Sequence, residues 1–380
     1  MKGIYLDNNA TTPVAPEIAL ELFSYFSKYY GNPSSLHRLG VEAERAVSKA
    51  RRCLGRLLRV GEQEIVFTSG GTESVNLAIK GAAQAMKRYG NHIVTSPTEH
   101  NAVLASVSSL KQFGFSVDFV EVDSTGKVIP EVVSDLIKSD TILVAMMHIN
   151  NELGTINPIN NIARAVKAKN KQTLVFSDGA QAFGKQEIDL TDIDLYSISG
   201  HKFHASKGSG ALYIKDKTPL QPLISGGGQE RGLRSGTENV EGIIGLAKAA
   251  ELAYSQLANL QEHWQKLRTY FIRGLKALPD VVINSPYDAL RNTINVSFGS
   301  IPSEVMMYSL EEKGVYVSAS SACGSTKRKP SHVLKAVGLP AKRIQSAIRF
   351  SFSRYNTDEE IRYTLKCLNE ILDNLKTIIR

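Results

Sequence analysis

Cysteine is scarce in this sequence, and its scarcity limits where the protein can act. Only three cysteines, Cys53, Cys323 and Cys367, occur in 380 residues. An odd, low number at scattered positions does not suit a disulfide framework and fits a reducing compartment, so we expect a cytoplasmic protein. The chain also lacks the run of about 18 apolar residues that a membrane span needs, and its N-terminus lacks the apolar stretch of a signal peptide. We therefore expect no membrane association.

Long runs of like charge are absent as well. The net charge of +8 comes from lysines and arginines spread along the chain, without the aromatic-interleaved basic patch of a nucleic-acid-binding protein. A G-x-G-x-x-G dinucleotide fingerprint after a strand and a Walker phosphate loop are also missing. We therefore expect no direct binding to nucleic acid, although a basic balance alone is compatible with it.

The length and the hydrophobic pattern predict an α/β fold. A chain of 380 residues exceeds the roughly 250–300 residues that one core supports, so we expect two domains. Between residues 64 and 214, short β-branched apolar runs end in polar loops, and amphipathic stretches lie between the early ones. This alternation indicates βαβ units and a mostly parallel sheet with strands buried on both faces. The predicted strands are 64–68, 92–95, 117–122, 141–147, 173–176, 194–198 and 210–214, and the amphipathic helices are 73–87, 103–112 and 159–167.

The pattern changes after residues 226–228. Residues 247–278 predict one long helix that Pro279 ends. The elements predicted beyond it are strands at 293–298 and 347–352, helices at 303–313 and 357–377, and a serine-rich loop at 318–325. This part favours a smaller α+β domain.

Residues that directly follow the strands are candidates for a site, because open parallel sheets bind ligands beyond the carboxyl ends of their strands. Residues 69–73 (SGGTE) follow the first strand and lead into a helix. Small residues and the unpaired N–H groups of a helix N-terminus suit a phosphate, although an ordinary strand-to-helix turn has the same pattern. His100 follows the second strand; it can stack on a ring, but a loop histidine is more often structural.

Later strand ends carry an amide, a carboxylate and two lysines. Asn151 could hydrogen-bond a ring hydroxyl, although asparagine is also a common turn residue. Asp178 needs a positive partner at a buried strand end, which a pyridinium N–H or an arginine would supply. Lys202 can form a Schiff base with an aldehyde cofactor. Lys207 lies only five residues further on, so the local sequence does not decide which lysine is functional.

These groups together predict pyridoxal 5′-phosphate (PLP). This cofactor needs a phosphate cradle, a stacking histidine, an acidic partner for its pyridine nitrogen and a lysine for its aldehyde, and no other common cofactor needs all four.

Ten segments, in order along nearly the whole chain, resemble those of the NifS-type cysteine desulfurases. That family lies in the aminotransferase class V branch of the fold-type I PLP enzymes. The segments are YLDNNATTP (5–13), GNPSSLH (31–37), FTSGGTESVN (67–76), EHNAVL (99–104), NNELG (150–154), DGAQ (178–181), SGHKFHASKG (199–208), GGGQERGLRSGT (226–237), SSAC (320–323) and IRFSF (348–352).

The resemblance implies a PLP-dependent transferase fold of type I. Its large domain has a mostly parallel, mixed seven-stranded sheet flanked by helices, and its C-terminal domain is a smaller α+β unit. We expect the large PLP-binding domain at residues 15–258. The small domain, with the catalytic cysteine loop, is expected at residues 1–14 and 259–380.

The resemblance also implies which residues hold the cofactor. They are Gly71, Thr72, His100, Asn151, Asp178, Gln181, Ser199, His201, Lys202 and Thr237. Lys202 carries the Schiff base in this family and Asp178 pairs with the pyridine nitrogen. His100 stacks on the ring and assists proton transfer, and Gln181 contacts the ring hydroxyl. Thr237 reaches the neighbouring subunit's site, which implies an obligate homodimer.

The implied substrate is L-cysteine. Asn151 lies near it and Arg349 clamps its carboxylate by a bidentate pair. Cys323, in the serine-rich loop beside three basic residues at 327–329, is the implied sulfur acceptor, because nearby positive charge favours a thiolate. Cys53 and Cys367 fall among apolar neighbours on helical stretches and suit a structural role better.

The expected reaction is conversion of L-cysteine to L-alanine, with the sulfur passed to Cys323 as a persulfide. An acceptor protein, such as an iron–sulfur scaffold, then takes the sulfur. The nearest alternative is a selenocysteine lyase or another PLP-dependent cysteine lyase of the same fold, which would not need Cys323. A binding protein on an inactivated PLP fold is a further alternative, against which Lys202, Asp178 and His100 together argue.

Overall fold

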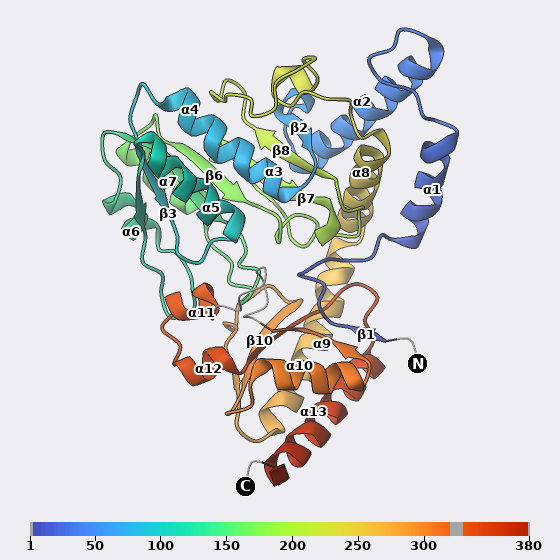
Figure 1. The fold of residues 1–380 in the computed structure, drawn as a ribbon, viewed down its shortest axis with the longest axis vertical. Helices are drawn as coiled ribbons and strands as arrows, with labels where there is room; N and C mark the ends of the chain where they lie inside the picture. Colours follow the sequence, from blue (N-terminus) through green and yellow to red (C-terminus); the bar gives the residue numbers. More distant parts are fainter. Residues whose placement is uncertain (1–2, 320–329, 379–380) are drawn as a thin grey trace.

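The computed structural model describes residues 3–319 and 330–378. These residues form two larger sheets, one in the upper and one in the lower part of Figure 1, and a two-stranded pair. The larger sheet has seven strands in the order β2-β8-β7-β6-β5-β3-β4. Only β8 runs antiparallel to its neighbours, so the predicted mostly parallel, mixed sheet is confirmed. The strands are β2 (Ile65–Thr68), β3 (His92–Thr95), β4 (Ser116–Phe119), β5 (Thr141–Met147), β6 (Leu174–Asp178), β7 (Leu195–Ser199) and β8 (Gly210–Ile214).

The strands of the large sheet are buried on both faces, with one exception. β5 is buried along its whole length, as its uninterrupted apolar run predicts. The expectation is wrong for β4, which lies at the edge of the sheet and pairs only with β3. Phe119 at its end is 46% exposed, and the strand ends there instead of at Val122. β2, at the other edge of the sheet, is buried along its whole length, so an edge position allows exposure but does not require it, and the sequence run 117–122 did not indicate it for β4.

Helices cover both faces of the large sheet. On β5, Val144 and Met146 belong to one core and Leu143 and Ala145 to the other, as the two-residue period of a strand requires. One core receives α2 (Arg38–Leu58), α6 (Pro130–Asp135), α7 (Ile159–Lys169) and α8 (Val240–Ser255), and the other receives α3 (Gly71–Asn76), α4 (Ala82–Met86) and α5 (Asn101–Leu110). A π-helical turn, Leu77–Gly81, joins α3 to α4, so the helix predicted over 73–87 is present as one continuous run.

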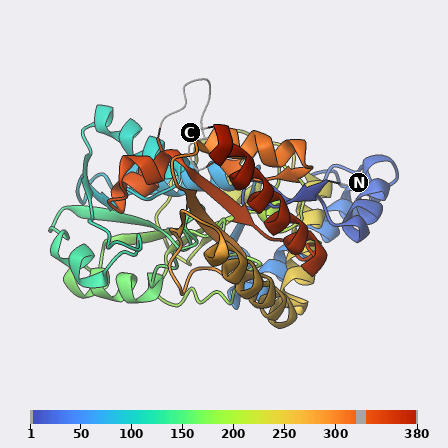
Figure 2. The same cartoon turned by 90° about the horizontal axis from the view of Figure 1, so that it is seen from below.

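The lower part contains the second sheet, which is antiparallel with the order β12-β13-β10-β9. Its core also holds Leu6 from the N-terminal segment. Figure 2 views this part from below. The elements are α9 (Leu257–Ala277), β9 (Val281–Ile283), β10 (Thr293–Phe298), α10 (Ser303–Glu312), β12 (Ser318–Ala319), β13 (Ala347–Ser351) and α13 (Asp358–Ile378), and a pair formed by β1 (Ile4–Tyr5) and β11 (Val315–Tyr316) lies beside them.

The prediction of one helix over residues 247–278 is wrong. α8 ends at Ser255 and α9 begins at Leu257, and Gln256 between them leaves the helical region with φ −112° and ψ 5°. Ala247 packs in the core of the large sheet, whereas Leu260 packs in that of the small sheet. The chain changes core at this point, and the apolar periodicity continues across the break.

The remaining helices are short, except for α1 at the N-terminal side. They are α1 (Pro16–Ser27), α11 (His332–Ala336) and α12 (Ala341–Gln345). Among the residues described, no helix combines the length and the apolar character needed to cross a bilayer.

Candidate active site

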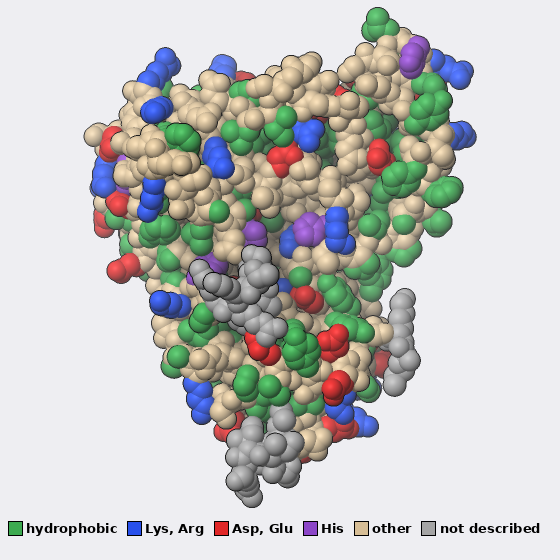
Figure 3. Space-filling view, viewed as in Figure 1, with side chains coloured by type: hydrophobic (Ala, Val, Ile, Leu, Met, Phe, Trp, Pro, Cys, Tyr) green, Lys and Arg blue, Asp and Glu red, His purple; other side chains and the backbone are tan. Residues whose placement is uncertain are grey.

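A cavity of about 610 Å³ lies where the carboxyl ends of β5, β6 and β7 face the N-terminal segment and β13. In the space-filling view, histidine and basic side chains gather where the upper and lower parts of the molecule meet (Figure 3). The predicted site residues that line the cavity are Gly71, Thr72, His100, Asn151, Asp178, Gln181, Ser199, His201, Lys202 and Arg349. These predicted site residues lie up to 278 positions apart in the sequence, from Gly71 to Arg349, and the fold brings them to one cavity.

The loop between β2 and α3 approaches the cavity with almost no side chains. Gly70 has φ +148°, a conformation that side chains disfavour. Its backbone also passes close to β8, so that a Cβ added at Gly210 would lie 2.6 Å from the Gly70 Cα. A Cβ at Gly71 would lie 3.1 Å from the Cβ of Ser199. The first N–H groups of α3 and the Thr72 and Ser199 hydroxyls therefore border a space into which an anionic group fits.

Glu73 fixes this loop from the side. Its carboxylate accepts a hydrogen bond from Ser69 N (2.9 Å) and pairs with Arg234 Nε (3.0 Å). These hydrogen bonds and the Arg234 charge lower the pKa of Glu73 against the opposing effect of burial, so the carboxylate stays ionised. Glu73 therefore fixes the start of α3 through Ser69 and Arg234, and this support does not require Glu73 itself to contact an anion bound in the cavity.

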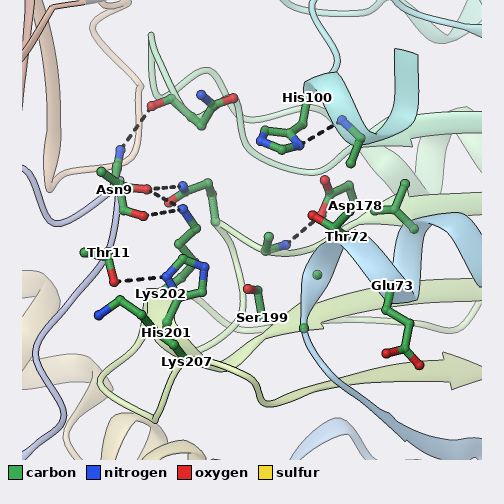
Figure 4. A pocket seen from close by; sticks show the side chains of 18 of the residues that line it. Asn9, Thr11, Thr72, Glu73, His100, Asp178, Ser199, His201, Lys202 and Lys207 are labelled. Atoms are coloured by element: carbon green, nitrogen blue, oxygen red, sulfur yellow. Dashed lines mark hydrogen bonds between the residues drawn. The ribbon is translucent and has the colours of Figure 1, made fainter. Parts of the chain in front are cut away.

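Lys202 follows β7 and its amine lies at the cavity. Nζ donates to the backbone oxygens of Asn9 and Ala10, both at 2.8 Å, so the N-terminal segment holds it (Figure 4). Lys207 also lines the cavity but is exposed to solvent. The structure therefore favours Lys202 over Lys207 as the functional lysine, which the local sequence left open.

Asp178 ends β6 and is 6% exposed. Its Oδ1 accepts hydrogen bonds from Ala180 N (3.0 Å) and from the Ser197 hydroxyl (2.7 Å). Among the described residues it forms no ion pair, and it lines the cavity. A buried carboxylate that has no cationic partner in the described part of the chain fits a ligand that brings a protonated nitrogen.

His100 is the N-cap of α5 and lies near Asp178 at the cavity (Figure 4). Its Nδ1 accepts a hydrogen bond from Ala102 N (3.1 Å), so Nε2 carries the proton of the neutral ring. Desolvation by the surrounding protein lowers the pKa of His100, although the Asp178 charge acts in the opposite direction. A neutral imidazole in this position can stack on an aromatic ligand.

His201 precedes Lys202 and is neutral as well. Burial, followed by the charges of Lys202 and Lys207, lowers the pKa of His201 to about 4. Its Nδ1 lies 3.0 Å from the Thr11 hydroxyl. As a neutral ring, His201 can offer one N–H to an anion without adding charge.

Arg349 lies on β13 and is 2% exposed. Nη1 donates to Asn151 O (2.9 Å) and Nη2 pairs with Asp7 Oδ1 (2.8 Å), while Nε is buried without a partner among the described residues. The N-terminal segment and the loop after β5 thus hold the guanidinium at the cavity wall. A guanidinium held in this way suits recognition of a carboxylate.

Two predicted site residues do not line this cavity. Thr237 borders a separate hollow of about 140 Å³ that shares Ser69 and Gly208 with the larger cavity. Cys323 lies outside the described residues. The other two cysteines are as expected for structural residues: Cys367 is buried, Cys53 is half-buried, and burial raises the pKa of both thiols.

Sequence reasoning missed the part played by the N-terminal segment. Asn9 accepts hydrogen bonds from Lys202 and from Gln181 at its backbone oxygen, and it donates through Nδ2 to Thr293 and Asn151. Asp7 holds Arg349. Both residues lie in the YLDNNATTP segment, which was noted only as a resemblance, and no local pattern indicates their contacts because the partners are far away in the sequence.

The chain is similar to known proteins in sequence and in structure. The aminotransferase class-V family matches residues 4–364. The cysteine desulfurase IscS of Methanosarcina thermophila is 43% identical over 99% of this chain and 94% of its own length. A solved structure of a NifS-like protein is 43% identical with a TM-score of 0.93, covering 98% of this chain and 99% of its own. A structure of SspA in complex with cysteine is 36% identical with a TM-score of 0.83, covering 93% and 100%.

The chain belongs to the aminotransferase class-V family, which confirms the predicted family and the fold of type I. PLP dependence follows from this membership, and the cavity fits the cofactor. The side-chain-free loop before α3 suits its phosphate, the buried carboxylate of Asp178 suits its pyridine nitrogen, and the amine of Lys202 suits its aldehyde.

Proposed function

We infer that this chain is a PLP-dependent cysteine desulfurase. It converts L-cysteine to L-alanine and passes the sulfur to a cysteine of its own. The observation that carries the inference is the likeness to cysteine desulfurases over nearly the full length of the chain, with 43% identity to IscS of Methanosarcina thermophila. These comparisons favour a desulfurase over the selenocysteine lyase or other cysteine lyase considered as alternatives.

Bound PLP supplies an electron sink for the bond being broken at the substrate's Cα. Lys202 is proposed to hold the cofactor and, once released, to move the proton at Cα. The backbone oxygens of Asn9 and Ala10 support this role because they accept hydrogen bonds from the Lys202 amine and so provide a position for it near the cavity. Asp178 keeps a pyridine nitrogen protonated, and His100 covers the ring and assists proton transfer.

The substrate carboxylate is proposed to bind at Arg349, beside Asn151. The buried Nε of Arg349, which lacks a partner among the described residues, supports this assignment, as does the clamp that Asp7 and Asn151 form around the other two nitrogens. Gly71, Thr72, Ser199 and His201 are proposed to hold the cofactor phosphate, and Gln181 the ring hydroxyl.

Cys323 is proposed as the sulfur acceptor. The described residues on both sides of it are tied to the cavity, which supports this role. On one side, Ser318 of β12 pairs with Arg349 of β13. On the other side, the Ser331 hydroxyl donates to Glu152 (2.6 Å) and His332 Nε2 donates to Glu99 O (2.9 Å), next to His100.

Product analysis tests the function. Purified protein with PLP, L-cysteine and a reductant should yield equal amounts of alanine and sulfide, and Cys323→Ala should yield neither. Cys367→Ala serves as the matched control, because this thiol is buried in α13 and should not take part. Pyruvate in place of alanine, or full activity in Cys323→Ala, would assign the chain to another reaction of the same fold.

The homodimer is a further proposal. The apolar side of α1 supports it, because Leu20, Phe23 and Phe26 are 78%, 74% and 65% exposed there, and apolar side chains lie along α1 at the upper right of Figure 3. Thr237 is proposed to enter the partner's cofactor site. It is exposed and lies outside the chain's own larger cavity, which supports an action across the interface.

A complementation experiment tests this proposal. Lys202→Ala and Thr237→Ala should each be impaired alone. After denaturation and joint refolding, a mixed dimer contains one site with both native residues, so activity should return to roughly a quarter of the wild-type level. No recovery would contradict an action of Thr237 in the neighbouring site.

The acceptor protein, the location and the domain boundaries are proposals as well. We propose transfer of the sulfur to an acceptor such as an iron–sulfur scaffold, in the cytoplasm. The proposed division into residues 15–258 and residues 1–14 with 259–380 is supported by the cores, since Ala15 packs with the large sheet and both Leu6 and Leu260 pack with the small one.

A further inference from the structure

Lys185 is a buried lysine to which the proposed chemistry gives no role. It is 4% exposed, and its Nζ donates to two amide oxygens, Gln181 Oε1 (2.6 Å) and Asn9 Oδ1 (3.2 Å). Within the described part of the chain it forms no ion pair with a carboxylate. Burial lowers the pKa of Lys185 well below its usual value, and the charges of Lys202 and Arg349 lower it further. Burying an amine in this way is costly, so its two contacts require an explanation.

The contacts of Lys185 fix the orientation of the Gln181 amide. Oε1 accepts from Lys185, and Nε2 donates to Asn9 O (2.9 Å). A flipped amide would place its nitrogen against the Lys185 donors and its oxygen against the Asn9 carbonyl, and both hydrogen bonds would be lost. Nε2 has two N–H groups, of which Asn9 uses one. The second N–H is the group that Gln181 can offer to the cavity that it lines.

Lys185 itself lies behind the cavity wall. It borders a small space of about 20 Å³ with Gly184, Phe203 and Trp264, and it does not line the large cavity. It therefore reaches a ligand only through Gln181 and Asn9. Since Asn9 O also accepts from the Lys202 amine, the same few atoms connect Lys185 to the functional lysine.

We propose that Lys185 is a positioning residue of the cofactor site, which holds the Gln181 amide so that an N–H and not the carbonyl oxygen faces the cavity. Donation from the Lys185 amine polarises that amide, and the polarised N–H favours an anionic ring oxygen of the cofactor. This rests on the proposed contact between Gln181 and the ring hydroxyl. Without the oriented and polarised donor, a ring oxygen is less stable as an anion, and the cofactor bound at Lys202 holds its proton more tightly.

The pH titration of the holoenzyme's absorption band measures this effect. In Lys185→Met we expect the midpoint to rise by about one pH unit, a tenfold increase in proton affinity. Arg268→Met is the matched control. Arg268 is also 4% exposed and outside the lining of the cavity, but its hydrogen bonds among the described residues go to the backbone oxygens of Thr293 and Pro286 and not to Gln181 or Asn9. This variant should lower stability and leave the midpoint unchanged, as would Lys185→Met if the lysine were merely structural.

A double-mutant cycle tests whether Lys185 acts through Gln181. In a Gln181→Ala background, Lys185→Met should add little further shift, because the amide that it orients is gone. An unchanged midpoint in Lys185→Met, or the same shift with and without Gln181, would overturn the proposal.

A second variant guards against misfolding of Lys185→Met. Lys185→Gln removes the amine but keeps a polar group at the buried position, and it should move the midpoint in the same direction by at least half as much. An unmoved midpoint there would also overturn the proposal. The readout needs only bound PLP, so a protein that makes no alanine would contradict the desulfurase function without affecting this test.

Discussion

The two walls of the cavity are built in different ways. On the wall formed by the large sheet, each functional group directly follows a strand or begins a helix, as do Asp178 after β6 and His100 before α5. The opposite wall consists of the N-terminal segment and β13. There Arg349 and Asn9 are held by side-chain hydrogen bonds between residues that lie far apart in the sequence.

This difference predicts how the two walls respond to substitution. The backbone positions the large-sheet wall, so a change near a functional residue should have a small effect unless it removes that residue. A few side-chain contacts position the functional residues of the other wall. Substitution of a supporting residue should therefore impair the functional residue that it holds, even though that functional residue is still present. The following substitutions test this contrast.

Lys202→Ala should have the largest effect, because it removes a functional group from the first wall. We expect kcat to fall by at least about 10⁴-fold, since we propose that both attachment of the cofactor and proton transfer depend on this amine. The absorption band of the lysine-bound cofactor should disappear. Lys207→Ala, which removes the exposed lysine of the same cavity, should keep the band. A band that persists in Lys202→Ala would contradict the assignment.

Asp7→Asn tests the second wall. The guanidinium of Arg349 loses a charged partner at 2.8 Å, so the KM for L-cysteine should rise roughly ten- to a hundredfold, with a smaller change in kcat. Asp288→Asn is the control, because it breaks a surface ion pair with Lys127 in which Asp288 is 61% exposed. Steady-state kinetics would reject the prediction if Asp7→Asn changed kcat alone.

Ser197→Ala returns to the first wall and should have a smaller effect. It removes the hydroxyl that donates to Asp178 Oδ1, but the backbone N–H of Ala180 remains. The dissociation constant for PLP should rise about five- to tenfold. Ser177→Ala is a matched control on the neighbouring strand, since the Ser177 hydroxyl is buried without a partner among the described residues. Equal losses in both variants would argue against support of Asp178 by Ser197.

The stability of the protein should depend on pH through His148, which directly follows β5 of the large sheet. Burial lowers the pKa of His148 to about 4, so the folded protein binds fewer protons there than the unfolded chain does. The free energy of unfolding should therefore fall by about 3 kcal/mol from this residue as the pH drops from 6.5 to 4. His148→Gln should reduce proton uptake on unfolding in this window by about one. Denaturation curves at several pH values that keep the wild-type slope would contradict this.

The same contrast explains what the sequence could predict. The strand at 141–147 was predictable because six of its seven residues are apolar and require burial, and Asp178 because a strand end in a parallel sheet faces the ligand side. The helix break at Gln256 could not be predicted, because the apolar periodicity continues across it while the chain passes from the core of the large sheet to that of the small sheet. Asp7 and Lys185 were not predictable either, because their roles arise from contacts between distant segments.

The pairing of Asp7 with Arg349 has a consequence for synthesis of the protein. The two residues are separated by 342 positions, so the ribosome makes one almost first and the other almost last. The large sheet ends with β8 at Ile214, and Lys202 and Asp178 both precede that point. Because chains fold from the N-terminal side during translation, a nascent chain can form the cofactor wall well before Arg349, the proposed site for the substrate carboxylate, has been made. If Arg349 has this proposed role, an unfinished chain lacks the group that holds cysteine in the cavity.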